Sequence, residues 1–165
     1  MQREMERVTH PIEPIFNETS QYLILGSFPS VASREAAFYY GHPQNRFWRV
    51  LAEVFGQPLP TSNDERRKLI LSNRLALWDV IASCRIRGSA DSAIIEVVPN
   101  DLSRIFAVAP IKRIIVNGRT AEKYYLKLQY PKTGILPTVL PSTSPANAAW
   151  NIEGLIDAWR EAVQG

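Results

Sequence analysis

The sequence is poor in the side chains that commonly hold metals, with one cysteine and two histidines among 165 residues. This scarcity excludes a disulfide framework, a cysteine-ligated iron–sulfur cluster and any usual zinc site. No apolar run approaches the length of a membrane span, and the charged, proline-broken N-terminus does not fit a signal peptide. We therefore expect a soluble intracellular protein that holds no metal and has no membrane partner.

Signature loops for phosphate binding and for serine nucleophiles are also missing. No Gly-x-Gly-x-x-Gly follows the first predicted strand, no Walker loop occurs, and there is no Gly-x-Ser-x-Gly elbow. Cys84 has no histidine near it in the sequence, so we interpret it as a buried, inert thiol. The chemistry of the chain must therefore come from other side chains.

The composition is typical of one packed domain over residues 1–165, with residues 1–19 as an N-terminal extension that packs on it or trails from it. The net charge is +3, from 19 basic and 16 acidic side chains. Residues 61–132 hold 13 basic and 7 acidic side chains, a net of +6. A basic middle suits a polyanion such as nucleic acid, and it also suits a mixed solvated surface.

Short apolar runs alternate with amphipathic segments along the chain. Strands are predicted over 22–27, 75–81, 112–117 and 134–140. Helices are predicted over 45–55, 62–71, 99–106, 118–128 and 150–163, and the irregular stretch 82–98 is expected to form a mobile loop. The alternation predicts an α/β fold, a three-layer α/β/α sandwich around a central, mainly parallel four-stranded sheet. In such a sheet the ligand site lies at the carboxyl ends of the strands.

The loop after the first predicted strand is rich in aromatic and polar side chains. Three consecutive aromatics, residues 38–40, are followed by His42, Asn45 and Arg46. Aromatic rings can stack on a nucleobase, and an asparagine can pair with a base edge or hold a water molecule. The same residues also fit a structural interpretation, with the aromatics in the core and Asn45 as the N-cap of the next helix.

The loop after the last predicted strand, 140–147, is stiff and small. Two prolines restrict it, and Ser142, Thr143 and Ser144 offer hydroxyls. Loops of this kind suit close approach to a phosphate backbone. They suit helix capping ahead of Trp150 equally well.

Two short motifs lie at the ends of the first and last predicted strands, Gly26-Ser-Phe-Pro-Ser30 and Leu140-Pro-Ser-Thr-Ser-Pro145. The pair resembles the uracil-DNA glycosylase superfamily, and the run YYGHPQNRFW over 39–48 is similar to its hypoxanthine-DNA glycosylase (DNA-deoxyinosine glycosylase) subgroup. The resemblance covers residues 20–163. It implies a monofunctional DNA repair glycosylase without a cofactor, which flips a deaminated base out of DNA and hydrolyses its N-glycosidic bond to leave an abasic site.

Two positions depart from the pattern of that superfamily. Many members carry Asp or Asn two residues after the glycine of the first motif to handle the attacking water, and this chain has Phe28 there. Some members begin the last motif with a histidine that stabilises the leaving base, and this chain has Leu140. The subgroup resemblance gives the catalytic role to Asn45, which would hold a water beneath C1′. His42 is a candidate donor to the leaving base or a residue of the turn.

The resemblance also implies residues that read the flipped base. Phe28 would stack on it, with backbone N–H groups near Ser27 and Phe28 as donors to the leaving base. Asp79 would accept N1–H of hypoxanthine or N3–H of uracil, where adenine and cytosine present an acceptor. Asn117 is the last of the residues expected to bind the base. Structural roles stay open, because Asp79 could cap a turn or pair with Arg85, and Asn117 could cap the next helix.

Contacts with DNA fall to the last loop and to arginines under the same resemblance. The hydroxyls and arginines would bind phosphates, and the tip of the loop would fill the gap left by the flipped base. The residues in this set are Ser142, Thr143, Ser144, Pro145, Asn147, Arg46 and Arg85.

Other functions remain open from the sequence. They are a mismatch-directed uracil-DNA glycosylase, a non-catalytic module that binds a damaged base on the same fold, and a small-molecule domain of flavodoxin-like shape. Hypoxanthine, uracil and xanthine are not ranked by any residue pattern. We expect a monomer that acts on DNA containing a deaminated base, located in the cytoplasm and, in a bacterium or archaeon, associated with the nucleoid.

Overall fold

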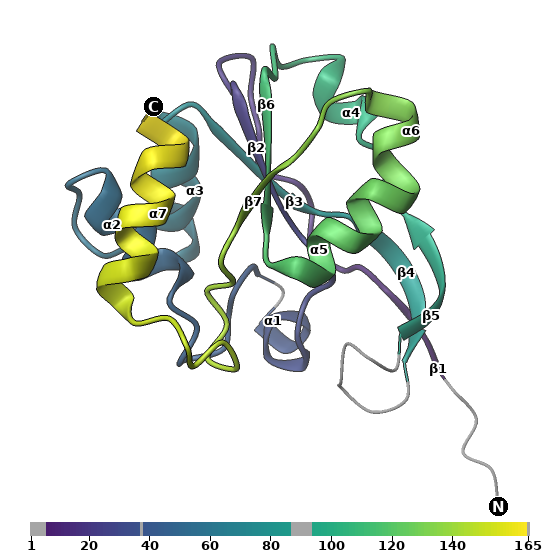
Figure 1. The fold of residues 1–165 in the computed structure, drawn as a ribbon, viewed down its shortest axis with the longest axis horizontal. Helices are drawn as coiled ribbons and strands as arrows, with labels where there is room; N and C mark the ends of the chain where they lie inside the picture. Colours follow the sequence, from purple (N-terminus) through teal and green to yellow (C-terminus); the bar gives the residue numbers. More distant parts are fainter. Residues whose placement is uncertain (1–5, 37, 87–93, 165) are drawn as a thin grey trace, which may run out of the picture.

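The computed structural model describes residues 6–36, 38–86 and 94–164, which form two β-sheets with helices around them (Figure 1). The larger sheet has four strands in the order β3-β2-β6-β7, and all of its neighbouring pairs are parallel. Its strands are β2 (Tyr22–Gly26), β3 (Leu75–Asp79), β6 (Arg113–Asn117) and β7 (Thr138–Leu140).

Helices cover both faces of the larger sheet, which confirms the predicted three-layer sandwich. Helices α2, α3 and α7 lie on one side, and α4, α5 and α6 lie on the other (Figure 1). The helices are α1 (Val31–Ala36), α2 (Phe47–Val54), α3 (Asn63–Ser72), α4 (Ser103–Phe106), α5 (Arg119–Tyr124), α6 (Tyr130–Thr133) and α7 (Ile152–Gln164). A π-helical turn, Tyr125–Gln129, joins α5 to α6, so the helix predicted to end near residue 128 continues to Thr133.

The central strands are buried on both faces, which explains their unbroken apolar runs. Leu23, Ile24 and Leu25 of β2 are fully buried, as are the three middle residues of β6. A parallel strand covered by helices on both sides has no polar face to alternate with. Because the strands are parallel, their carboxyl ends meet at one edge of the sheet, the lower edge in Figure 1.

The smaller sheet shows that the expected loop over 82–98 was wrong. It is antiparallel, in the order β1-β4-β5, with β1 (Glu6–Thr9), β4 (Ile81–Ile86) and β5 (Ile94–Pro99). The strand predicted over 75–81 ends at Asp79, and β4 starts two residues later. In β5, Ile94 is buried and Ile95 is 45% exposed, so this strand lacks a continuous apolar signal. Residues 87–93 of the expected loop lie outside the described residues.

Two buried amides fix the corner between β3 and β4. Asn100 Nδ2 donates to the carbonyl oxygens of Asp79 and Ile81, at 2.8 and 3.2 Å. Gln129 Nε2 donates to the carbonyl oxygens of Asn100 and Val80, at 2.8 and 3.2 Å. Gln129 is buried and ends the π-helical turn, a distortion often found where a side chain serves a function. The two amides therefore hold Asp79 at the edge of the sheet.

We expect Gln129→Leu to lower the free energy of unfolding by about 1–3 kcal/mol, because the buried Asn100 carbonyl loses this donor. Urea denaturation measures the change. Gln44→Leu is the matched control, since Gln44 is exposed and the same substitution there should shift stability by no more than about 0.5 kcal/mol. Equal midpoints for the two variants would contradict the role given to Gln129.

Candidate active site

A cavity of about 520 Å³ opens at the carboxyl ends of the parallel strands. This edge is where open α/β sheets bind their ligands, and every strand of the larger sheet contributes to the lining through its last residue or the loop that follows. The loop before α2 adds Asn45. The predicted residues that line the cavity are Ser27, Phe28, Asn45, Asp79, Asn117, Ser142, Thr143 and Ser144.

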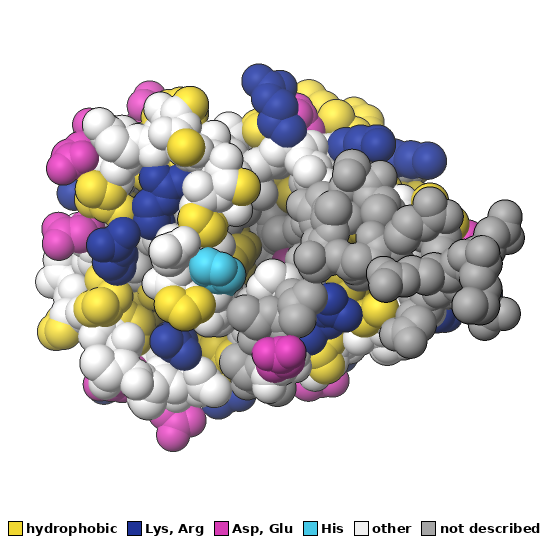
Figure 2. Space-filling view, turned by 90° about the horizontal axis from the view of Figure 1, so that it is seen from below, with side chains coloured by type: hydrophobic (Ala, Val, Ile, Leu, Met, Phe, Trp, Pro, Cys, Tyr) yellow, Lys and Arg dark blue, Asp and Glu magenta, His cyan; other side chains and the backbone are white. Residues whose placement is uncertain are grey.

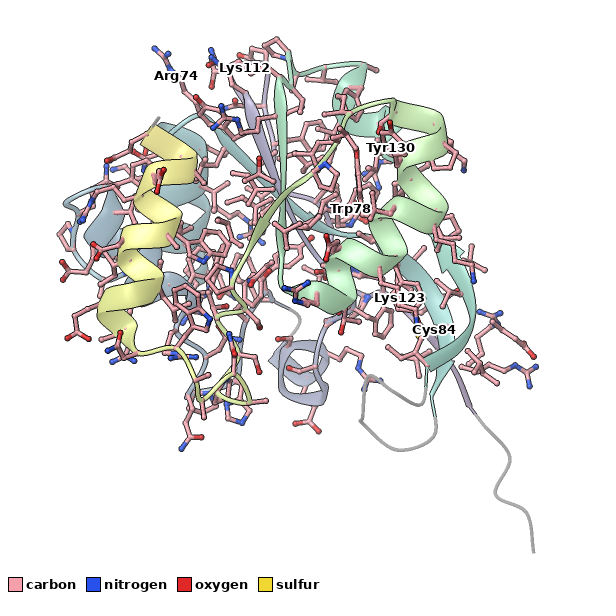
Figure 3. The ribbon with its side chains drawn as sticks, viewed as in Figure 1. Arg74, Trp78, Cys84, Lys112, Lys123 and Tyr130 are labelled. Carbon is pink, nitrogen blue, oxygen red and sulfur yellow. The ribbon has the colours of Figure 1, made fainter. Side chains whose placement is uncertain are left out.

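The basic side chains of the described residues do not form one patch on the face that contains the strand ends (Figure 2). Figure 2 views the molecule from the side of the strand ends, where lysine and arginine side chains lie singly among hydrophobic and uncharged ones. Arg74 and Lys112 lie at the opposite end of the larger sheet, just before β3 and β6 (Figure 3). The positive charge of residues 61–132 therefore does not by itself mark a surface for nucleic acid.

Asn45 is held by the start of α2 and by the last loop. Its Oδ1 accepts the backbone N–H of Phe47 at 2.9 Å and the hydroxyl of Thr143 at 2.9 Å. A backbone N–H can only donate, so the first bond also fixes which end of the amide is oxygen. Both lone pairs of Oδ1 are used, and Nδ2 has no hydrogen-bond partner among the described residues. Asn45 thus satisfies a helix N-terminal N–H while lining the cavity.

Asn117 and Thr143 extend this chain of hydrogen bonds behind Asn45. Asn117 Nδ2 donates to Thr143 Oγ1 at 3.1 Å and to the Tyr40 hydroxyl at 3.2 Å, and its Oδ1 accepts the Thr143 N–H at 3.1 Å. Thr143 is fully buried, so we reassign it from phosphate contact to support of Asn45. Helix α5 has no side-chain cap, so the alternative capping role of Asn117 is wrong.

Asp79 pairs with His10, to which no role was given from the sequence. Asp79 Oδ2 and His10 Nε2 lie 2.7 Å apart, and the two side chains are 5% and 3% exposed. Arg85 pairs with Glu96 on the smaller sheet instead, at 2.9 Å, so the alternative Asp79–Arg85 pair is wrong and Arg85 lies outside the cavity lining. His10 and Asp79 are 69 positions apart, and no local pattern could have indicated their contact.

Phe28 lies beside this buried pair. Its ring meets the His10 ring edge-on, with 5.9 Å between centroids, and the Arg34 guanidinium lies 5.8 Å from its centroid. The chain approaches Asp79 closely just before Phe28. A Cβ on Gly26 would lie 2.4 Å from Asp79 Oδ1 and 3.0 Å from the Tyr40 hydroxyl oxygen, so only glycine fits there.

Tyr39 and Tyr40 supply neutral hydroxyls near this carboxylate. Burial raises the pKa of each phenol well above its ordinary value, and the charge of Asp79 raises both pKa values further. The Tyr39 hydroxyl donates to the carbonyl oxygen of Glu13 at 2.9 Å. Phe38 and Tyr39 are 2% exposed and belong to the core, whereas the Tyr40 hydroxyl accepts from Asn117 at the cavity.

Arg46 holds the last loop in shape. Its guanidinium donates to the carbonyl oxygens of Thr143, Ser144, Asn147 and Trp150, and its backbone N–H donates to Thr143 O at 3.1 Å. A guanidinium has five N–H donors, and these carbonyls engage most of them. We therefore interpret Arg46 as the residue that shapes the loop, rather than as a phosphate contact.

The other predicted residues of the last loop lie at the mouth of the cavity or beyond it. The hydroxyl oxygen of Ser142 accepts the Ser144 N–H at 3.1 Å, and both serines remain partly exposed. Asn147 Nδ2 donates to the Ser142 carbonyl oxygen at 3.0 Å, and Pro145 is exposed at the loop tip. The loop thus keeps a fixed shape while presenting its tip to solvent.

Several features lie outside the cavity lining. His42 is exposed in the turn before Asn45, with Nδ1 accepting the Gln44 N–H at 3.1 Å. Cys84 is fully buried on β4 (Figure 3).

The described residues contain no group of three or more His, Cys, Asp or Glu side chains placed to hold a metal ion. Within the same ranges, no helix has the length and apolar character needed to cross a membrane.

Comparisons with known proteins agree with this architecture. The sequence profile of the Uracil DNA glycosylase superfamily matches residues 13–163. Curated relatives from Methanosarcina barkeri and Methanosarcina acetivorans, both named hypoxanthine DNA glycosylase, are 32% and 38% identical over 90% and 81% of this chain and 94% and 84% of their own lengths. A solution NMR structure of a Methanosarcina acetivorans protein, described as a candidate uracil DNA glycosylase, matches with a TM-score of 0.77 and 33% identity, covering 93% of this chain and 97% of that one. The chain belongs to the uracil DNA glycosylase superfamily.

Proposed function

We propose that this chain is a DNA repair glycosylase that hydrolyses the N-glycosidic bond of a deaminated base flipped out of DNA, with hypoxanthine as the first substrate. The observation that carries the proposal is the cavity at the strand ends, where an aromatic ring, a buried carboxylate and an asparagine amide line one space. Enzymes that act on a base read it in such a pocket, by stacking and by hydrogen bonds to its edge. The names of the two curated relatives support the choice of hypoxanthine.

Base recognition rests on Phe28 and Asp79. Phe28 offers a flat ring for stacking, and Asp79 Oδ2 is taken by His10, which leaves Oδ1 for a ligand. An ionised carboxylate only accepts hydrogen bonds. It matches N1–H of hypoxanthine and the corresponding N–H of xanthine and uracil, and it repels the ring nitrogen lone pair that adenine and cytosine present there. Deamination of adenine or cytosine therefore replaces a ring acceptor by the N–H donor that this carboxylate would accept.

Hydrolysis needs a water placed at C1′ and a base that leaves as an anion. In a dissociative transition state the C1′–N bond breaks first and its electron pair goes to the base, while the sugar gains oxocarbenium character. Asn45 Nδ2 would donate to the oxygen of the water, which keeps a lone pair for C1′, and a water proton then passes to the departed base. This revises the expected carbonyl-held water, because Oδ1 already accepts two bonds. Positioning of this kind lowers a barrier by several kcal/mol.

Stabilisation of the leaving base would come from donors within the cavity. The backbone around Ser27 and Phe28 lines it and remains the proposed source of N–H donors. His42 is not among the lining residues, so we remove it from the catalytic proposal.

Contact with the DNA backbone would involve the exposed rim of the cavity. Pro145 and Ala146 are exposed at the loop tip and would enter the duplex where the base has left. Ser142 and Ser144 offer polar groups at the rim, and the guanidinium of Arg119 lines the mouth with its side chain 92% exposed. These groups suit phosphates, which bind mainly through charge and hydroxyl or backbone donors.

Uracil is the second candidate base. It carries N3–H beside a carbonyl, the same arrangement as N1–H in hypoxanthine, and Asp79 would accept it in the same way. The related Methanosarcina acetivorans structure, described as a candidate uracil DNA glycosylase, favours this extension.

The proposal is tested with labelled duplexes that carry one deoxyinosine, deoxyuridine, deoxyxanthosine or deoxyadenosine at the same position. We expect many alkali-labile strand breaks at deoxyinosine and far fewer at deoxyadenosine, and the breaks at deoxyuridine and deoxyxanthosine set the order of substrates. Tight duplex binding without any abasic site would instead identify a non-catalytic binding module. If the protein has no salt-dependent affinity for DNA, that result would overturn both the glycosylase and the binding-module hypotheses and would favour a small-molecule domain.

A further inference from the structure

We infer that His10 is a positioning residue of this site, whose neutral imidazole donates to Asp79 and holds that carboxylate as an oriented acceptor for the base. The inference rests on the proposed function, because it concerns the same cavity. It also gives the N-terminal segment a part in base recognition, although none of residues 6–15 lines the cavity.

Backbone pairing on both sides of His10 fixes its place. Strand β1 ends with Thr9 opposite Ser83 of β4, and the His10 N–H continues the ladder by donating to the Ala82 carbonyl oxygen at 2.6 Å. Further along the chain, Ile15 pairs with Leu77 of β3 through two backbone hydrogen bonds of 2.9 Å each. The segment between these anchors runs along the outer edge of β3 and brings the imidazole to the end of that strand.

The hydrogen bonds of His10 determine which nitrogen carries the proton. The Ile12 backbone N–H donates to His10 Nδ1 at 3.2 Å, so Nδ1 must present a lone pair. The proton of the neutral ring then sits on Nε2, which lies 2.7 Å from Asp79 Oδ2. In a doubly protonated ring, the Nδ1–H group of His10 would point at the Ile12 N–H, and neither group can accept a hydrogen bond. The pair is therefore a neutral donor and an anionic acceptor, with a net charge of −1.

This arrangement determines which hydrogen-bonding atom Asp79 offers to a base. With Oδ2 bound to His10, Oδ1 is the oxygen that lies against Gly26, and Asp79 lines the cavity. The neighbouring hydroxyls of Tyr39 and Tyr40 are neutral, and Arg34 and Arg119 are the basic side chains of the lining. A protonated Asp79 could donate to the ring nitrogen of adenine, and a rotated carboxylate would no longer aim its oxygen at the base. With Oδ2 bound to His10, the carboxylate presents Oδ1 as an acceptor, so His10 supports the rejection of adenine and cytosine, whose ring nitrogens also only accept.

Two substitutions distinguish the role of the N–H donor of His10 from the role of its imidazole ring. His10→Gln keeps an N–H at the position of Nε2, and His10→Leu removes it while filling similar space. We expect His10→Leu to slow deoxyinosine cleavage in the duplex by about 10- to 100-fold, as for loss of a hydrogen bond to a charged group, and to narrow the ratio of deoxyinosine to deoxyadenosine cleavage. His10→Gln should restore most of both values. Thermal melting of each variant verifies that the fold is retained.

The opposite results overturn the inference. A His10→Gln variant that is folded but as slow as His10→Leu would indicate proton transfer by the ring, and an unchanged base ratio in His10→Leu would indicate a purely structural role. A wild-type protein that cleaves no duplex would defeat the proposed function, and the arrangement of His10 is then still tested by spectroscopy.

Nitrogen NMR tests the arrangement without any activity. The chain has two imidazoles, so a long-range ¹H–¹⁵N spectrum of the wild-type protein at neutral pH should show two ring patterns, assigned with His42→Gln. We expect His10 to show a protonated Nε2 and an unprotonated Nδ1. A proton on Nδ1, alone or together with one on Nε2, would contradict the inference whether or not the substituted proteins fold.

Discussion

Asn45→Ala should slow cleavage of a deoxyinosine duplex by about 100- to 1,000-fold, the largest effect that we expect from any single substitution. The change removes the amide proposed to position the attacking water, and the Thr143 hydroxyl loses the acceptor that it binds at 2.9 Å. Single-turnover cleavage, followed as alkali-labile breaks in the labelled strand, measures the chemical step apart from product release. DNA affinity should change little, because Asn45 lies inside the cavity.

Two further variants make this result specific. Gln44→Ala truncates the neighbouring exposed amide and should leave the rate unchanged. Asn45→Asp keeps oxygen acceptors for Phe47 and Thr143 but has no N–H, so we expect it to be as slow as Asn45→Ala. A rate near that of the wild type in Asn45→Asp would show that an oxygen handles the water, and it would contradict the role of Nδ2.

Asp79→Asn should change which base the site prefers. His10 donates through Nε2, so the new amide would turn its oxygen to His10 and its NH₂ group to the cavity. A donor would then face N1–H of hypoxanthine, and the same donor matches the lone pair of adenine N1. We expect deoxyinosine cleavage to fall by about 10- to 100-fold and the ratio of deoxyinosine to deoxyadenosine cleavage to narrow. Competition between the two labelled duplexes in one reaction measures the ratio directly.

The substitution also removes one negative charge, which calls for a matched control. Asp101→Asn makes the same change at the start of α4, where Asp101 binds Ser103 and is exposed. It should leave the base ratio unaltered. If Asp79→Asn slows both substrates equally, Asp79 serves the fold rather than recognition of the base.

The larger sheet was predictable because its strands are buried on both faces. The apolar runs of β2 and β6 follow directly from that burial, and the rule for parallel sheets then located the site at the strand ends. Asp79 and Asn117 end such strands, and the resemblance to the glycosylase superfamily supplied the base-binding roles expected of them and of Phe28. The local sequence therefore predicted the buried strands and the position of the site.

The smaller sheet and the partners of the site could not be predicted in this way. Strand β1 is four residues long and mostly polar, and β5 has one exposed face, so neither carries a strong periodic signal. The contact of His10 with Asp79 depends on the pairing of β1 with β4. The bonds of Arg46 reach carbonyls about 100 residues away, and in the sequence this arginine resembles any surface cation.

The bond between Thr143 and Asn45 spans 98 positions of the chain. It forms through the loop that follows β7, the last strand of the larger sheet. A chain made from its N-terminus therefore contains the proposed catalytic amide long before it contains the residues that orient it. The proposed active site is therefore complete only after Thr143 has been synthesised, so shorter nascent chains would lack glycosylase activity.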